Sequence, residues 1–276
     1  MSNDEQMQRD VASIALDSAG SVGFALAGSG AIREHGLTHR PTADIDLFTV
    51  MSAQDRFTGA VDEVVDRLRE SGYGVEVPRR SESFARLSVT TEDREVDVDL
   101  GIDWRSREPV ALEVGPVLAI EDAVGNKVAA LYSRGEARDY LDVDAIRASG
   151  RFTDDQLVDL ASNADPGFDA DMFAQQLQKV ERIQLREVSV YGVNQSDLAG
   201  VVERSNDWAR ALTDSPVPGA GRRDAQAEQS IAQAMKNRPP SGPKAGLSGD
   251  TPTPRSYDHA RDAARGQRRP GHEQQK

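Results

Sequence analysis

The sequence predicts an α+β protein: a core around a small mixed sheet, then a helical domain, then a flexible tail. Short runs with strand period alternate with helical runs over residues 10–118, whereas residues 119–212 show helical spacing alone. Residues 213–276 hold eight of the thirteen prolines and seven glycines, so they bury too little apolar surface to offset the entropy of ordering. These three observations predict a core over 10–118, a helical domain over 119–212 and a basic Pro/Gly-rich tail over 213–276.

Each element follows from its local pattern. Alternating or apolar runs predict strands over residues 22–27, 43–50, 73–77, 84–90 and 94–102, the last two joined by a hairpin turn at 91–93. Spacing of three and four residues between apolar positions predicts helices over 30–35, 54–70, 153–164, 168–187 and 195–212. Residues 119–149 read as two helices, with a break near 133–135.

Composition limits the compartment and the partners. The chain has no cysteine, which excludes disulfides and thiolate metal sites, and its first ten residues lack the features of a signal peptide. No apolar run approaches the roughly 18–20 residues that a membrane span needs, so we expect a cytoplasmic protein without a membrane partner. Residues 236–276 carry nine basic and four acidic residues, which leaves a balance of −18 on the rest. The negative charge of the residues before 236, which we call the body of the chain, slows the approach of a polyanion. A nucleic-acid substrate therefore requires local basic patches.

Asp44 and Asp46 are one residue apart in the strand predicted over 43–50. Because side chains alternate between the faces of a strand, both carboxylates point the same way, while Ile45 and Leu47 point into a core. Two carboxylates on one face repel each other unless a cation, a proton or solvent relieves them. Paired carboxylates of this kind can hold Mg²⁺ against a triphosphate.

The strand predicted over 94–102 carries a second acidic face, made of Glu95, Asp97 and Asp99. If this strand lies beside the Asp44 strand, three carboxylates converge, the third being Asp97 or Asp99. Two of them bridge a pair of Mg²⁺ ions, and the third ligates one ion and takes the proton of an attacking hydroxyl. For Asp97 and Asp99 taken alone, a solvated strand face is the alternative interpretation.

Gly28 and Ser29 lie where a predicted strand turns into a short helix. Small residues at such a turn let backbone N–H groups approach a phosphate closely, and the hydroxyl of Ser29 adds another donor. The positive N-terminal end of the helix favours the same ligand. For this pair taken alone, an ordinary tight turn is the better interpretation.

Together these motifs resemble the nucleotidyltransferase superfamily that includes DNA polymerase beta. Its pattern is Gly-Ser, a helix of one or two turns, Asp-x-Asp, and a third Asp on a neighbouring strand. Arg40, just before the aspartate pair, narrows the resemblance to the AbiEii/MenT group of nucleotidyltransferase toxins, over roughly residues 20–212. The resemblance favours Asp99 over Asp97, because the Leu-Gly-Ile that follows Asp99 sits where the strand usually ends. Many members follow Gly-Gly or Gly-Ser with threonine and alanine, whereas this chain has Gly30 before Ala31, which leaves the phosphate-binding hydroxyl to Ser29.

A second segment, residues 127–142, supports the same resemblance. In a helix, Lys127, Leu131 and Arg134 lie near one face. The two cations, Lys127 and Arg134, then lie beside the apolar residues of that face and can reach a triphosphate. The AbiEii/MenT group carries a Lys, an Arg and an Arg-Asp pair at such spacing. The supporting candidates from this segment are Arg138, Asp139 and Asp142. Ordinary helix charge pairing, such as Arg138 with Asp142, is the alternative.

The resemblance implies a cytoplasmic enzyme that uses an NTP with two Mg²⁺ ions, or Mn²⁺, as cofactors. It implies metal binding by Asp44, Asp46 and Asp99, activation of an acceptor hydroxyl by Asp99, and charge compensation by Lys127 at the phosphates. The implied nucleotide-binding residues are Gly28, Ser29, Arg40, Lys127 and Arg134. The implied acceptor is RNA, often the 3′ end of tRNA; the outcome is growth arrest; and the partner is a winged-helix antitoxin.

Two alternatives stay open on the sequence. An antibiotic nucleotidyltransferase, modifying aminoglycosides or lincosamides, would use the same chemistry, and the acidic body suits cationic drugs. A non-catalytic nucleotide-binding protein on the same scaffold is the second, because a fold does not guarantee an activity.

Overall fold

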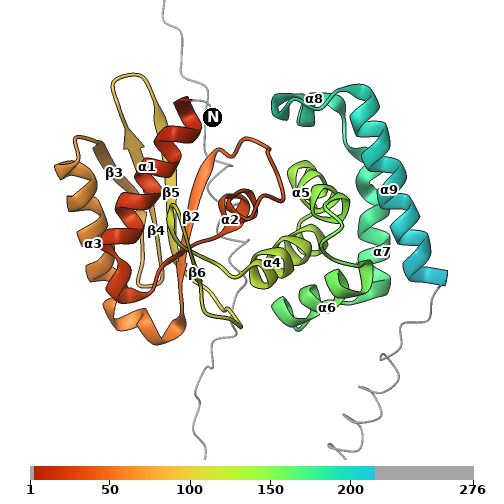
Figure 1. The fold of residues 1–276 in the computed structure, drawn as a ribbon, viewed down its shortest axis with the longest axis horizontal. Coiled ribbons are helices and arrows are strands. Elements are labelled where there is room, and N and C mark those ends of the chain that lie inside the picture. Colours follow the sequence, from red (N-terminus) through yellow and green to blue (C-terminus); the bar gives the residue numbers. More distant parts are fainter. Residues whose placement is uncertain (1–2, 215–276) are drawn as a thin grey trace, which may run out of the picture. The chain divides into compact units, whose positions relative to one another are not determined.

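The computed structural model describes residues 3–214 (Figure 1). The tail predicted over 213–276 lies outside the described residues, except for Thr213 and Asp214, which form the end of a helix. By their contacts the described residues belong to one compact unit, so a domain boundary between residues 118 and 119 stays a prediction. Within the described part of the chain, no helix combines the length and the apolarity that a bilayer crossing requires.

In residues 3–214, seven strands form one mixed sheet in the order β3-β4-β5-β2-β1-β7-β6. Two pairs are parallel, β2 with β5 and β1 with β7, and the other neighbours are antiparallel. The strands are β1 (Ala25–Leu26), β2 (Asp44–Thr49), β3 (Gly74–Arg80), β4 (Phe84–Thr90), β5 (Glu95–Ile102), β6 (Val110–Leu112) and β7 (Gly115–Val117). The predicted α+β class with a small mixed sheet is confirmed.

Helices cover the sheet and then form a separate cluster. Those of the sheet region are α1 (Asn3–Ser18), α2 (Gly28–Glu34) and α3 (Gln54–Glu70), with short 3-10 turns η1 (Gly20–Val22) and η2 (Met51–Ala53). The cluster consists of α4 (Ile120–Ser133), α5 (Ala137–Ala148), α6 (Asp154–Ala164), α7 (Ala170–Gln178), η3 (Lys179–Arg182), α8 (Leu185–Val188), η4 (Ser189–Tyr191) and α9 (Gln195–Asp214). Figure 1 shows α1 and α3 against the sheet, and α2 between the sheet and α4.

The two central strands separate apolar from acidic side chains. Ile45 and Leu47 of β2 are 3% and 0% exposed, and Val98 and Leu100 of β5 are fully buried. These side chains join one hydrophobic core with the buried face of α3, which includes Phe57. The aspartates between them therefore project from the opposite face of the sheet.

The structure differs from the predicted elements in four places. The helix α1 was not expected, although its buried residues Met7, Val11, Ala12, Ala15 and Leu16 have helical spacing. The strand predicted over 22–27 shortens to β1, because Gly23, at φ +75°, ends η1 just before it. The short strands β6 and β7 were also missed. The helix predicted over 168–187 divides into α7, η3 and α8.

Candidate active site

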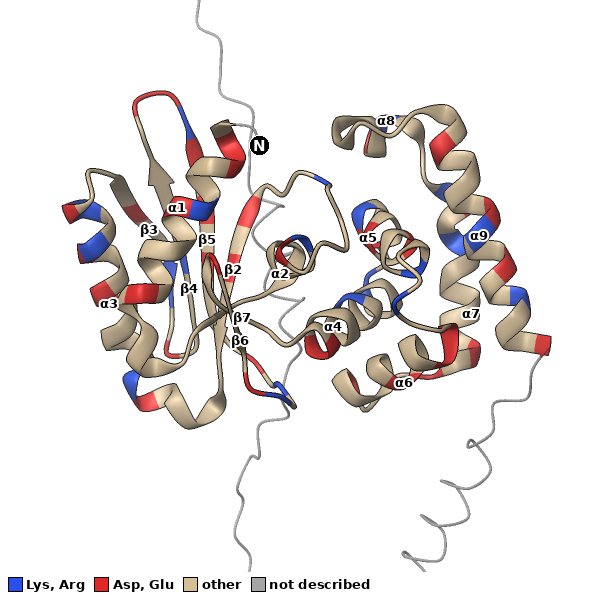
Figure 2. Cartoon of the chain, viewed as in Figure 1, with Lys and Arg blue, Asp and Glu red and all other residues tan. Residues whose placement is uncertain are grey.

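The aspartates of β2 and β5 meet because these strands pair in parallel. The register places Asp44 opposite Asp97 and Asp46 opposite Asp99. Ligand oxygens of Asp44, Asp46 and Asp99 all lie within 4.8 Å of one another, and we call these three residues the carboxylate cluster. Asp99 is fully buried, and Asp46 is 6% exposed. Figure 2 shows the acidic residues on neighbouring stretches of β2 and β5.

Arg86 of β4 offsets part of this negative charge. Its Nε and Nη2 donate to the two oxygens of Asp99 at 2.6 and 2.7 Å, and its Nη1 lies 3.9 Å from Asp97. A two-point guanidinium–carboxylate pair fixes the orientation of the carboxylate as well as balancing it. The sequence analysis missed Arg86. Its signal was the hairpin at 91–93, because counting back along β4 from that turn places Arg86 opposite Asp99.

Asp97 faces the same side of the sheet but is more open, with 43% of its side chain exposed. Partial burial raises the pKa of Asp97. Arg86 acts to lower this pKa, and the nearby carboxylates Asp99, Glu95 and Asp44 act to raise it. Asp99, rather than Asp97, belongs to the group of oxygens within 4.8 Å of one another.

Gly28 lies directly against the carboxylate cluster. It has φ +54°, a conformation that glycine adopts without strain, and a Cβ at this position would overlap the carboxylate of Asp46, with the Cγ at 2.8 Å. The amide of Ala27 also donates to the carbonyl oxygen of Asp46 at 2.8 Å. The turn into α2 is thus fitted closely to the second aspartate of the pair.

Ser29 connects this turn to the helical cluster. Its hydroxyl accepts hydrogen bonds from Arg40 Nη2 at 2.8 Å and Lys127 Nζ at 3.0 Å, and donates to Asp142 Oδ2 at 3.1 Å. Arg40 donates to both oxygens of Asp142 at 2.8 Å, and Lys127 Nζ lies 3.1 Å from Asp142 Oδ2. We call these four residues the Ser29 network. All four are buried, Asp142 completely.

The electrostatics of the Ser29 network keep Asp142 ionised. Burial alone would raise its pKa, but Lys127 and Arg40 outweigh burial and lower the pKa of Asp142 to about 2. Asp142 therefore stays negative at neutral pH and holds Ser29, Arg40 and Lys127 in one arrangement.

Three further candidates lie where α4 turns into α5. Arg134 donates from Nε and Nη2 to the two oxygens of Asp139 at 2.8 Å, and Asp139 accepts from the amide of Glu136 at 3.2 Å. Asp139 is fully buried, 4.0 Å from Lys127; burial acts to raise its pKa, but Arg134 and Lys127 lower it. Arg138 pairs with Glu136 at 2.8 Å, not with Asp142. These contacts stabilise the start of α5, the helix that carries Asp142.

The carboxylate cluster suits a divalent metal by its chemistry. Hard cations such as Mg²⁺ and Mn²⁺ prefer carboxylate oxygens, and the three side chains come from two adjacent strands of one sheet. Three carboxylates face one another beside the pair of Arg86 with Asp99, so a cation would relieve their repulsion.

Comparisons with known proteins add a family and a fold. The model of a family described as the nucleotidyl transferase AbiEii toxin of type IV toxin–antitoxin systems matches residues 10–218. The structure is similar to that of JHP933 from Helicobacter pylori, with 14% identity and a TM-score of 0.50 over 86% of this chain and 100% of that chain. A comparison with curated proteins gives no match.

Two further solved structures have the same fold. A nucleotidyltransferase structure from H. pylori, described as putative in its title, has 15% identity and a TM-score of 0.51 over 77% of this chain and 96% of that chain. MenT4, a nucleotidyltransferase toxin from Mycobacterium tuberculosis, has 16% identity and a TM-score of 0.51 over 82% of this chain and 92% of that chain.

Proposed function

This chain belongs to the AbiEii family of nucleotidyltransferase toxins, and from that premise we propose that it transfers a nucleoside monophosphate from an NTP to RNA. The acceptor we propose is the 3′ end of a tRNA. The observation that carries the proposal is the convergence of Asp44, Asp46 and Asp99 within 4.8 Å, with Gly28 against them. Membership of a type IV toxin–antitoxin family also implies an antitoxin partner.

Asp44, Asp46 and Asp99 are the residues that would hold two Mg²⁺ ions. Bound there, the metal supplies Lewis-acid charge neutralisation at the α-phosphate and the pyrophosphate leaving group. The protein contributes the fixed spacing of the three carboxylates, which the parallel register of β2 and β5 sets.

The Ser29 network binds the outer phosphates in this proposal. Lys127 and Arg40 bring two cations to the hydroxyl of Ser29, at 3.0 and 2.8 Å. Their charge offsets the negative charge that develops on pyrophosphate as it leaves. Arg134 contributes indirectly, because it fixes Asp139 at the start of the helix that carries Asp142.

Asp99 takes the proton of the acceptor hydroxyl. The hydroxyl oxygen bonds to the α-phosphorus, the bond from that phosphorus to the bridging oxygen breaks, and pyrophosphate leaves. Arg86 holds the Asp99 carboxylate by both oxygens, so its direction is fixed before the substrate arrives. With tRNA as the acceptor, the proposed reaction takes place in the cytoplasm. The antitoxin that we propose is a winged-helix protein.

A second acceptor is supported by the charge of the body. Outside residues 236–276 the chain has a balance of −18, which attracts a cationic drug more readily than an RNA. Nucleotidyl transfer to an aminoglycoside or lincosamide would use the same cluster and network.

The test uses the full chain with Mg²⁺, each α-labelled NTP in turn, and either total RNA or a panel of cationic antibiotics. We expect label on tRNA, located at the 3′ end by mass spectrometry, and Asp46→Ala should abolish it. Glu95→Ala is the matched control, because Glu95 is an exposed carboxylate on β5, the strand that pairs with the strand of Asp46. Label on a drug but not on RNA would establish the second acceptor. Incorporation by Asp46→Ala at the wild-type rate would refute the proposed site.

A further inference from the structure

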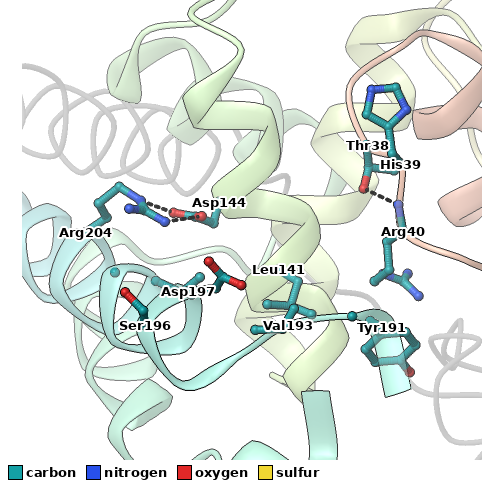
Figure 3. Close-up of a pocket in the computed structure, with 13 residues that line it drawn as sticks. Thr38, His39, Arg40, Leu141, Asp144, Tyr191, Val193, Ser196, Asp197 and Arg204 are labelled. Carbon is teal, nitrogen blue, oxygen red and sulfur yellow. Dashed lines mark hydrogen bonds and ion pairs between the residues drawn. The ribbon is translucent and has the colours of Figure 1, made fainter. Parts of the chain in front are cut away.

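A cavity of about 490 Å³ lies between the loop before β2, helix α5 and the segment that enters α9 (Figure 3). In this view Arg40 and Tyr191 lie at one end, and Asp144 and Arg204 lie at the other. The guanidinium of Arg40 stacks over the ring of Tyr191 at 4.7 Å. The volume is within the range of pockets that hold small organic ligands, roughly 300–1,000 Å³.

The cavity does not have the charge of a phosphate site. Arg204 is held by Asp144, with two hydrogen bonds of 2.7 Å, and Arg40 is held by Asp142. Arg204 is therefore balanced by Asp144, the N–H donors of Arg40 point to Asp142 and Ser29, and Asp197 adds a further negative charge to the lining.

The start of α9 is also satisfied from within the chain. The side-chain oxygen of Asn194 accepts from the amides of Ser196 and Asp197 at 2.8 and 3.0 Å. Asp197 accepts in turn from the amide of Asn194 at 3.0 Å. These amides already have an acceptor, so the helix end offers little to an anion.

The lining instead suits a flat, uncharged ring with polar edges. Tyr191 offers an aromatic surface, while Leu141, Val193 and Val201 form apolar walls. A carboxylate oxygen can accept more than one hydrogen bond, so Asp144 and Asp197 can accept from amino or ring N–H groups of a base in addition to their contacts with Arg204 and the Asn194 amide. Stacking on aromatic side chains is the common mode of binding for unpaired bases.

Arg40 connects this cavity to the Ser29 network. The same guanidinium that stacks on Tyr191 donates to Ser29 and Asp142. We propose that the cavity between α5 and α9 binds a nucleobase, while the Ser29 network on the other side of Arg40 binds phosphate. This inference rests on the proposed nucleotidyl transfer and names a base-binding site for it. The base belongs either to the NTP or to the acceptor, and the experiment separates the two.

The direct test is titration calorimetry of the full chain with the four ribonucleosides, which carry no phosphate. Gly200→Leu fills the cavity from α9, because a Cβ at Gly200 meets only the flexible end of Arg204, at 2.9 Å. Glu203→Leu is the matched control, since it adds the same side chain to an exposed position of that helix. We expect at least one nucleoside to bind the wild type and the control equally, and Gly200→Leu to weaken it at least tenfold.

Kinetics then identify the source of the base. A tenfold rise in KM for the NTP in Gly200→Leu, with KM for the acceptor unchanged, assigns the cavity to the donor base. The reverse pattern assigns it to the acceptor. Tyr191→Leu should repeat whichever pattern Gly200→Leu gives, because it removes the stacking surface without filling the cavity.

Two results would overturn the inference: no nucleoside binds the wild type, or Gly200→Leu binds as tightly as Glu203→Leu. Inorganic triphosphate serves as a separate probe, since Lys127→Ala should weaken its binding and Gly200→Leu should not. Loss of transfer with intact nucleoside binding would contradict the proposed function alone, so the two proposals fail independently.

Discussion

The carboxylate cluster and the Ser29 network treat charge in opposite ways. In the cluster, three aspartates crowd together and Arg86 pairs with Asp99, whereas in the network Asp142 is paired with both Arg40 and Lys127. The three carboxylates bring together negative charge that the proposed metal ions would offset. The network has two cations, Arg40 and Lys127, to the one carboxylate of Asp142, which holds both in position for the outer phosphates. Removing a carboxylate should therefore act mainly on activity in the cluster and mainly on stability in the network.

The largest expected effect is on activity in Asp44→Asn. The change removes one charged metal ligand, so we expect nucleotide transfer to fall at least about a thousandfold. Because it also relieves repulsion, the free energy of unfolding without metal should rise or change by less than about 1 kcal/mol. Labelled-nucleotide transfer and urea unfolding measure the two quantities. Mg²⁺ should raise the Tm of the wild type more than that of the variant.

The next effect is on stability, in Asp142→Asn. The substitution keeps the shape of the side chain but leaves Arg40 and Lys127 buried without their counter-charge. We expect the free energy of unfolding to fall by about 3–5 kcal/mol. Urea unfolding of Asp144→Asn, whose carboxylate pairs with the half-exposed Arg204, provides the comparison. Equal losses in the two variants would show that the Ser29 network is no more important to stability than a surface pair.

Gly28 lies between the carboxylate cluster and Ser29, so Gly28→Ala should have an intermediate effect on both stability and activity. The new Cβ overlaps the Asp46 carboxylate, and the backbone has positive φ, so we expect a loss of about 2 kcal/mol in stability and at least about tenfold in transfer. Gly36→Ala is the control, because Gly36 has φ +70° and no heavy atom within 4 Å of the added Cβ. Both variants should lose stability from backbone strain, Gly28→Ala by more because of the overlap with Asp46, and only Gly28→Ala should lose activity.

The last expected effect is on the pH dependence of stability, and it appears only at acidic pH. The pKa of Asp142 is lowered to about 2 in the folded protein, against about 4 for an unfolded aspartate. Its contribution, on the order of 2–3 kcal/mol, is fully present above the unfolded pKa and is lost as pH falls from about 4 to about 2. Urea unfolding between pH 7 and pH 2.5 should show the wild type approaching Asp142→Asn at the acidic end. A constant difference across this range would contradict the assignment.

Much of the fold was accessible from sequence because β2 and β5 sort their side chains strictly. Alternation of Asp44 and Asp46 with Ile45 and Leu47 predicts the strand and its exposed face, and the α+β class and the family are confirmed. The short elements were missed, because β6 and β7 have three residues each, too few to show a period. Helix α1 was missed because polar residues dominate its start, although its buried positions keep helical spacing.

The candidate site could be predicted only in part from the sequence. The third carboxylate depended on knowing that β2 and β5 are neighbours, which local pattern does not specify. Arg86 and Tyr191 reach the candidate sites through tertiary contacts, with Asp99 and with Arg40. Neither contact leaves a signal in residue spacing alone, apart from the hairpin register that aligns Arg86 with Asp99.

The carboxylate cluster forms only in one register of β2 against β5. A slip of one residue in either strand would turn its aspartates into the core and expose its aliphatic side chains. Burial of the aliphatic side chains of β2 and β5 thus fixes the register, and the register in turn fixes the spacing of the carboxylate oxygens. A change in a loop far from the site leaves these oxygens in place, whereas a change of register in either strand displaces every aspartate of that strand.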